Sequence, residues 1–108
     1  MAKLPQLTES QIRAWVDTDS FEKGWGYFQR GNILDPHRQG NTLRARCLGS
    51  MPEPYRLQVM LGQGEIQVAG CSCPVGDGGH CKHVVALLLT WLHKSETFLE
   101  VENLETDL

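Results

Sequence analysis

The feature that most constrains this chain is a short cluster of cysteines and histidines. Three of its four cysteines lie within eleven residues, in a segment that also holds two histidines. Clustered cysteines of this kind are typical metal ligands or redox groups, because the reducing cytosol disfavours structural disulfides. The chain is therefore expected to fold so that residues 71–83 close around one metal ion.

The local pattern predicts how this closure is made. Cys71 and Cys73 are two residues apart at the end of a predicted strand, where alternate side chains point to the same side. Three glycines between 75 and 79 let the chain turn back tightly. Two residues correspond to about 200° around a helix, so Cys81 and His83 cannot both bind from a helix interior. We expect Cys81 in the turn before a helix and His83 in its first turn.

Three thiolates and one imidazole form a ligand set typical of structural zinc, with iron as a competitor. The residues alone leave His80 and His83 as alternatives for the imidazole. A closed four-ligand site has no open position for water or substrate, which argues against an enzyme. Such sites bind zinc with roughly 10–16 kcal/mol in small peptides, so the C-terminal half should need the metal to fold. The fourth cysteine, Cys47, is expected to be a small buried apolar residue.

The remaining pattern predicts an α+β fold with two N-terminal helices. Thr8 or Ser10 can cap a first helix, on which Ile12, Trp15 and Val16 form an apolar stripe. A second helix is predicted over Ser20–Gln29, with Ser20 as its cap.

An antiparallel β-meander of three or four strands is expected next. Ile33-Leu34 begins a short strand that Asp35-Pro36 disturbs, and alternating apolar residues predict strands over 43–47, 55–61 and 66–71. The last of these strands carries the Cys-x-Cys pair at its end.

The strongest helical signal follows the metal motif. Its apolar residues recur at helical spacing: Val84, Leu87, Leu88, Trp91 and Leu92. The apolar arc is wider than one stripe, so this helix is either buried in its own core or covered by a partner.

Length and composition fit one soluble domain over 1–108. The chain has 108 residues, of which 41% are hydrophobic and 21% charged, and a domain of this size has a thin core that a metal would reinforce. It has no apolar run of about 20 residues for a membrane span and no visible secretory signal. We therefore expect a cytoplasmic protein.

Charge is unevenly distributed, although the net charge is only −3. Residues 23–56 hold six basic and two acidic side chains, whereas the tail over 94–108 holds one basic and five acidic side chains. Charge asymmetry alone is weak support for a nucleic-acid partner, because solvated surfaces show it too.

The motif resembles the SWIM zinc finger, in which Cys-x-Cys is followed at a distance by Cys-x-His. Here Cys71-x-Cys73, seven residues and Cys81-x-His83 match it, and the resemblance extends roughly over residues 20–93 through Phe21-Glu22-Lys23-Gly24. It implies that Cys71, Cys73, Cys81 and His83 hold the zinc, after a β-hairpin and before a helix. It also implies binding to DNA or protein without enzymatic activity.

Three functions are therefore considered. The first is a zinc-binding interaction module for protein, nucleic acid or both, in a regulatory or DNA-transaction complex. Its protein contacts would come from the last helix or from an amphipathic segment with Phe98, Leu99, Val101 and Leu104. The second is a DNA-binding finger, and the third, more remote, is a redox-responsive zinc-thiolate regulator. Neither a membrane nor a small-molecule substrate is expected. The residues assigned to nucleic acid are Arg44, Arg46, Arg56 and Lys82, with Trp25 or Tyr27 as possible stacking platforms.

Overall fold

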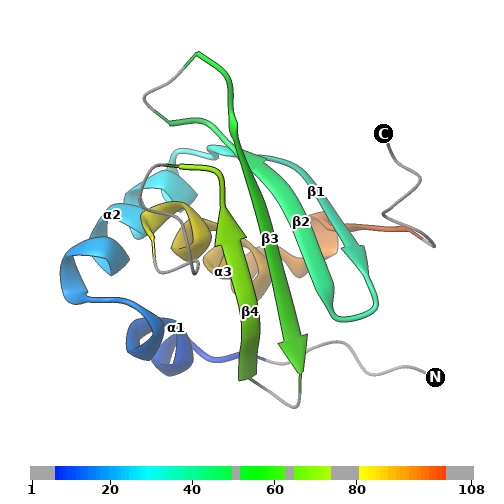
Figure 1. The fold of residues 1–108 in the computed structure, drawn as a ribbon, viewed down its shortest axis with the longest axis horizontal. Coiled ribbons are helices and arrows are strands. Elements are labelled where there is room, and N and C mark those ends of the chain that lie inside the picture. The colour runs from blue at the N-terminus through cyan, green and yellow to red at the C-terminus, as the bar shows by residue number, and fades with distance from the viewer. Residues whose placement is uncertain (1–6, 50–51, 63–64, 74–80, 102–108) are drawn as a thin grey trace.

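The computed structural model describes residues 7–49, 52–62, 65–73 and 81–101. Helices and strands alternate in blocks, as the α+β prediction requires (Figure 1). The helices are α1 (Glu9–Trp15), α2 (Thr18–Gln29), α3 (Lys82–Lys94) and the short 3-10 helix η1 (Ser95–Thr97). The strands are β1 (Ile33–Gln39), β2 (Thr42–Cys47), β3 (Tyr55–Gly62), β4 (Glu65–Cys71) and β5 (Leu99–Glu100).

The five strands form one sheet in the order β4-β3-β2-β1-β5. Strands β1 to β4 pair antiparallel with their sequence neighbours, which confirms the predicted meander. Apolar side chains alternate along β2 and β3, as in Leu43, Ala45 and Cys47, and are buried on one face. The arginines between them project from the opposite face.

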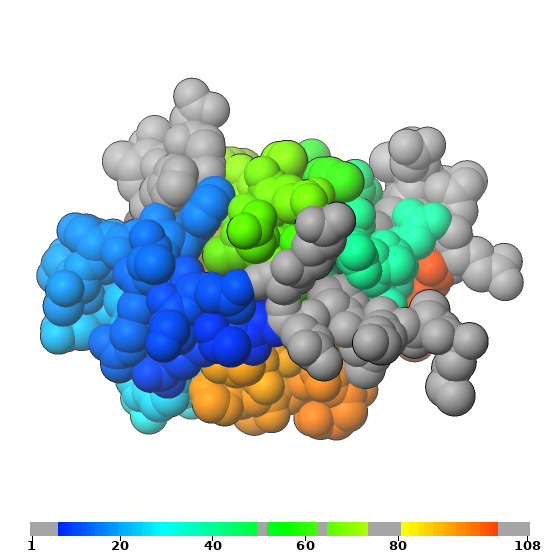
Figure 2. Space-filling model, turned by 90° about the horizontal axis from the view of Figure 1, so that it is seen from below, coloured from blue at the N-terminus to red at the C-terminus, as the bar shows by residue number. Residues whose placement is uncertain are grey.

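Helix α3 fills the space under the apolar face of the sheet. Every residue from His83 to Trp91 is buried, so the helix is covered on several sides. It contacts β1 to β4 on one side, while α1 and α2 pack against it elsewhere (Figures 1 and 2). The wide apolar arc of α3 is therefore explained by this chain's own core, and it gives no support to a partner on that helix.

The first two helices begin at side-chain caps. Of the two residues predicted as the cap of α1, Thr8 is the one observed. Its side chain accepts from the backbone N–H of Gln11 and closes a capping box. Asp17, rather than the predicted Ser20, caps α2 by accepting from the Ser20 N–H, so α2 begins two residues earlier. A side chain on Gly24 would place its Cβ 2.4 Å from Val85 Cγ1, and this glycine therefore permits the close contact of α2 with α3.

Two parts of the sheet differ from the sequence prediction. Strand β1 does not stop at Asp35-Pro36 but continues to Gln39, because Asp35 adopts a positive φ of 49° and the register shift is absorbed between Leu34 and His37. Strand β5 was not predicted, and it pairs in parallel with β1.

The start of the acidic tail packs on this chain itself. Phe98 is buried with its ring 5.1 Å from that of Trp91, and Arg38 forms an ion pair of 2.8 Å with Glu100. The expected amphipathic segment is therefore a strand on the sheet edge at residues 99–100, and Leu104 lies outside the described residues. In the described part of the chain, no helix has both the length and the apolar character needed to span a membrane.

Candidate metal centre

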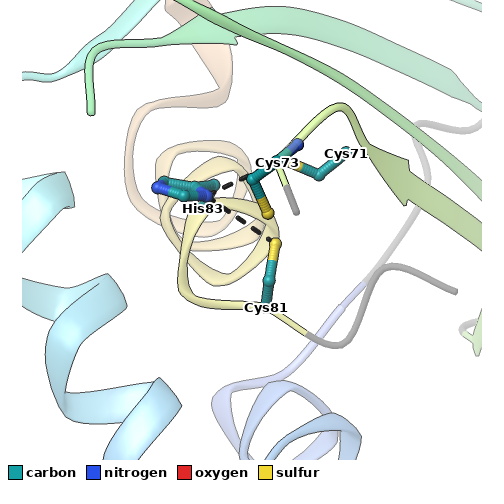
Figure 3. A group of neighbouring side chains, drawn as sticks. All are labelled: Cys71, Cys73, Cys81 and His83. Carbon is teal, nitrogen blue, oxygen red and sulfur yellow. Dashed lines mark hydrogen bonds between the residues drawn. The ribbon is translucent and has the colours of Figure 1, made fainter. Parts of the chain in front are cut away.

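The structure brings the four predicted ligands together between the sheet and α3. Cys71 ends β4, Cys73 follows in a bend, Cys81 is the N-cap of α3 and His83 lies in its first turn. Their ligand atoms all lie within 4.8 Å of one another (Figure 3). The predicted placement of Cys81 before the helix and of His83 inside it is therefore confirmed.

The distances suit a tetrahedral ion. The Nδ1 of His83 lies 3.7 Å from the Cys71 sulfur and 3.9 Å from the Cys81 sulfur. Zn–S bonds of about 2.3 Å and Zn–N bonds of about 2.0–2.1 Å place tetrahedral ligand atoms roughly 3.5–3.8 Å apart. A small contraction of the cluster would therefore bring all four donors to a zinc ion.

Backbone contacts hold the cysteine pair in position. The Cys73 N–H donates to the Cys71 sulfur at 3.4 Å, as amides often do beside metal thiolates. Ser72, between the two cysteines, accepts from the Arg56 N–H at 2.9 Å and donates its own N–H to the Arg56 carbonyl at 3.1 Å. The ligand-bearing turn is therefore tied to the first residues of β3.

A hydrogen bond between the Cys71 and Cys81 side chains shifts their pKa values in opposite directions. The Cys71 thiol donates to the Cys81 sulfur, which raises the pKa of Cys71 well above its ordinary value, with burial adding to the effect. The same hydrogen bond lowers the pKa of Cys81 to about 4, helped by the His83 side chain and despite burial. One ligand is thus already a thiolate at neutral pH, whereas Cys71 must lose its proton before it can bind a metal.

Two tyrosines hold the imidazole of His83. Its ring centroid lies 4.6 Å from that of Tyr55 and 5.2 Å from that of Tyr27. His83 is 4% exposed, its Nδ1 is the nitrogen turned toward the sulfurs, and its Nε2 has no hydrogen-bond partner among the described residues. Leaving a buried N–H unpaired costs about 1–3 kcal/mol, which a metal bond at Nδ1 would offset.

Cys47 is not part of the described ligand cluster. Cys47 is fully buried on β2, as predicted, and burial raises its pKa to about 12, so it stays a neutral thiol at physiological pH. His80, the alternative imidazole, lies outside the described residues.

The residues assigned to nucleic acid occupy two different places. Arg44, Arg46 and Arg56 project from the sheet face that no helix covers in the described structure, and we call this surface the arginine face. Lys82 is instead the first residue of α3, with its ammonium 5.7 Å from the Tyr27 ring centroid. Tyr27 has His83 as a neighbour and cations over its ring, so it is not an open platform for base stacking.

Sequence reasoning missed the groups that surround the ligands. Tyr55 was predicted only as the first residue of a strand, and Ser72 and Gly49 were given no role. A side chain on Gly49 would place its Cβ 2.4 Å from Tyr55 and 3.3 Å from the His83 Nε2. Nothing in the local pattern distinguishes these residues, because their role depends on the packing of α2 and β3 around α3.

The comparison with known families agrees with this geometry. Residues 58–92, from β3 through the ligands into α3, match the SWIM zinc finger family. The resemblance seen in the sequence is thereby confirmed for this segment, and the family match and the ligand cluster together support zinc binding in an interaction module. No curated protein and no solved structure matches the chain significantly.

Proposed function

We propose that this chain is a non-catalytic interaction module whose zinc ion, bound by Cys71, Cys73, Cys81 and His83, fixes the end of β4 to the start of α3. The convergence of these four side chains at one point supports the proposal. Three of the four are buried, which suits a closed structural site better than one open to substrate. Thiolate ligands persist in reducing surroundings, which favours the cytoplasm as the place of action.

The arginine face is the surface we assign to recognition. Arg46 and Arg56 lie directly opposite each other on β2 and β3, an arrangement that is destabilising when the charges are alike. Asp35 pairs with Arg46, while no ion pair to Arg56 occurs within the described residues. A polyanion lying across this face would neutralise the excess charge.

A nucleic-acid backbone is the polyanion that this surface fits best. Arg44 lies next to the other two arginines and is hydrogen-bonded through Nε to Gln58 Oε1 at 2.9 Å, which orients its guanidinium along the sheet. Guanidinium groups bind phosphates with paired hydrogen bonds, and a row of them can follow successive phosphates. The single observation that carries this assignment is the Arg46–Arg56 pair.

The test measures binding to a short DNA duplex and to single-stranded RNA at two salt concentrations. Arg44→Ala and Arg56→Gln should each weaken binding, while zinc content is unchanged. Each should also reduce the slope of log affinity against log salt concentration by about one, as for the loss of one phosphate contact. Arg13→Gln is the matched control, because Arg13 is an exposed arginine on α1, away from the sheet. Absence of binding at low salt, or equal weakening by the control, would refute the assignment.

A protein partner is the second candidate, because the same face carries an apolar patch. Met60 and Val68 face each other on β3 and β4 and are 39% and 54% exposed. A metal-loaded pull-down with and without nuclease separates the two candidates. Capture that survives nuclease, and that Val68→Thr reduces, would favour a protein in the regulatory or DNA-transaction complex that the module serves.

A further inference from the structure

A separate hollow lies on the helical side of the molecule, away from the arginine face. It has a volume of about 220 Å³ and runs along α2 to the first residue of α3. Three basic side chains and one acidic side chain line it, for a net charge of +2. The lining residues are Glu22, Lys23, Gly26, Tyr27, Arg30 and Lys82.

Two of these cations converge on one aromatic ring. The Arg30 guanidinium lies 5.0 Å and the Lys82 ammonium 5.7 Å from the Tyr27 centroid. Lys23 is paired with Asp19 at 3.1 Å, whereas neither Arg30 nor Lys82 forms an ion pair among the residues described. Two cations that line the same hollow, and that no carboxylate pairs with among the described residues, offer charge-assisted hydrogen bonds to an anion.

Gly26 supplies the space in this hollow. A glycine inside a helix is unfavourable relative to alanine, so its presence calls for a reason. Gly24 has one, since it contacts α3, but a Cβ on Gly26 would meet only the side chain of Arg30, with its nearest atom, Nη1, at 3.3 Å. The missing side chain leaves the Arg30 guanidinium room to lie beside Tyr27.

We infer that this hollow binds a phosphate monoester between Arg30 and Lys82. A monoester carries about −1.5 to −2 charges at neutral pH, which matches the two cations, Arg30 and Lys82, that no ion pair among the described residues neutralises, whereas a backbone phosphodiester carries only one. Arg30 offers a planar fork for two phosphate oxygens, and Lys82 offers a point charge. The source of the group is either a small phosphorylated molecule or the phosphorylated end of a nucleic-acid strand.

The first test uses inorganic phosphate alone, so it does not depend on the arginine face. Backbone amide shifts of the zinc-loaded protein are followed by NMR during titration with phosphate, at constant ionic strength. We expect the largest changes at Gly26, Tyr27 and Lys82, and roughly tenfold weaker binding in Arg30→Gln, as for loss of a charge-assisted hydrogen bond. Gly26→Ala should also weaken binding, although it leaves every charge in place.

The matched control is Lys94→Gln, because Lys94 also lies over an α2 ring, that of Phe28 at 5.8 Å, but outside the hollow. It should bind phosphate as the unmodified chain does. Unchanged amide shifts during the titration would overturn the proposal, as would equal phosphate affinity in Arg30→Gln and Lys94→Gln.

A second arm identifies the source. Oligonucleotides with a 5′-phosphate and with a 5′-hydroxyl are compared in the unmodified chain, Arg30→Gln and Arg56→Gln. A preference for the 5′-phosphate that Arg30→Gln removes and Arg56→Gln keeps would assign the site to strand ends. Phosphate binding without that preference would assign it to small phosphorylated molecules. If neither oligonucleotide binds, the nucleic-acid role of the arginine face fails. The titration with inorganic phosphate still tests whether the hollow binds a phosphate group.

Discussion

The sulfur of Cys71 and the Nδ1 of His83 lie 3.7 Å apart, although 12 positions separate the two residues in the chain. Cys71 ends β4, the edge strand of the sheet, and His83 lies in the first turn of the helix beneath it. A metal bound to both would connect the two layers at the point where the chain passes between them. The proposed zinc would therefore fix the end of β4 to the start of α3.

The contact between α2 and α3 should be sensitive to one methyl group. In Gly24→Ala the new Cβ would lie 2.5 Å from Val85 Cβ and 2.8 Å from the Lys82 carbonyl oxygen, neither of which can move without shifting α3. We expect a loss of about 1–3 kcal/mol in the free energy of unfolding, measured by denaturant titration of the zinc-loaded protein.

Gly26→Ala is the control for this substitution on the same helix. Its Cβ meets only the flexible end of Arg30, so better helix propensity should leave stability unchanged or raise it by up to about 1 kcal/mol. Equal destabilisation by the two variants would show that the close contact of Gly24 is not responsible.

The tyrosine packing around His83 should contribute to metal affinity. Gly49→Ala would place a Cβ 2.4 Å from Tyr55 Cε2 and 3.3 Å from His83 Nε2, which forces the tyrosine ring or the imidazole to move. We expect zinc binding at least tenfold weaker by competition with a chelating dye, comparable to loss of an outer-shell partner.

Gly70→Ala provides the comparison for Gly49→Ala, because a Cβ on Gly70 meets nothing within 4 Å. Its zinc affinity should equal that of the unmodified chain. If Gly49→Ala also binds zinc normally, the orientation of the imidazole does not depend on Tyr55.

Zinc affinity should rise with pH. The pKa of Cys71 is raised by its hydrogen bond to Cys81, so this thiol is protonated at neutral pH and must release its proton to bind zinc. Cys81, with a pKa of about 4, is already a thiolate and adds no pH dependence near neutrality. Each proton released on binding makes the zinc affinity rise about tenfold per pH unit.

The measurement is the zinc dissociation constant between pH 6 and 8, together with proton release in a weakly buffered solution. The predicted affinity falls as pH decreases, and at least one proton is released per zinc bound. A pH-independent constant would mean that Cys71 is not a ligand or does not hold a proton in the metal-free chain.

Local patterns in the sequence predicted the elements that carry strong periodicity. Leu43, Ala45 and Cys47 marked β2 correctly, and the apolar run after His83 marked α3, because each pattern reflects burial against one neighbouring layer. The ligand cluster was predicted for a similar reason, since strand geometry and the helix start limit where Cys71 and Cys81 can lie.

Elements that depend on distant contacts were missed. Leu99 and Glu100 form only a two-residue strand. Two contacts with Arg38 on β1 hold it: the Arg38 side chain pairs with Glu100, and the Arg38 carbonyl accepts from the Val101 N–H at 2.8 Å. No local period signals such pairing. The continuation of β1 past Pro36 was missed for the same reason, because antiparallel pairing with β2 outweighs the local break.

Zinc stoichiometry tests the central claim most directly. Native mass spectrometry of the purified chain should find one zinc ion per molecule, consistent with one four-ligand cluster. Cys73→Ser should retain almost none and lose the helical circular dichroism of its C-terminal half, whereas Cys47→Ala should keep the full complement, because Cys47 is buried and neutral. A zinc-free parent chain, or Cys73→Ser with a full complement of zinc and an intact fold, would contradict the account.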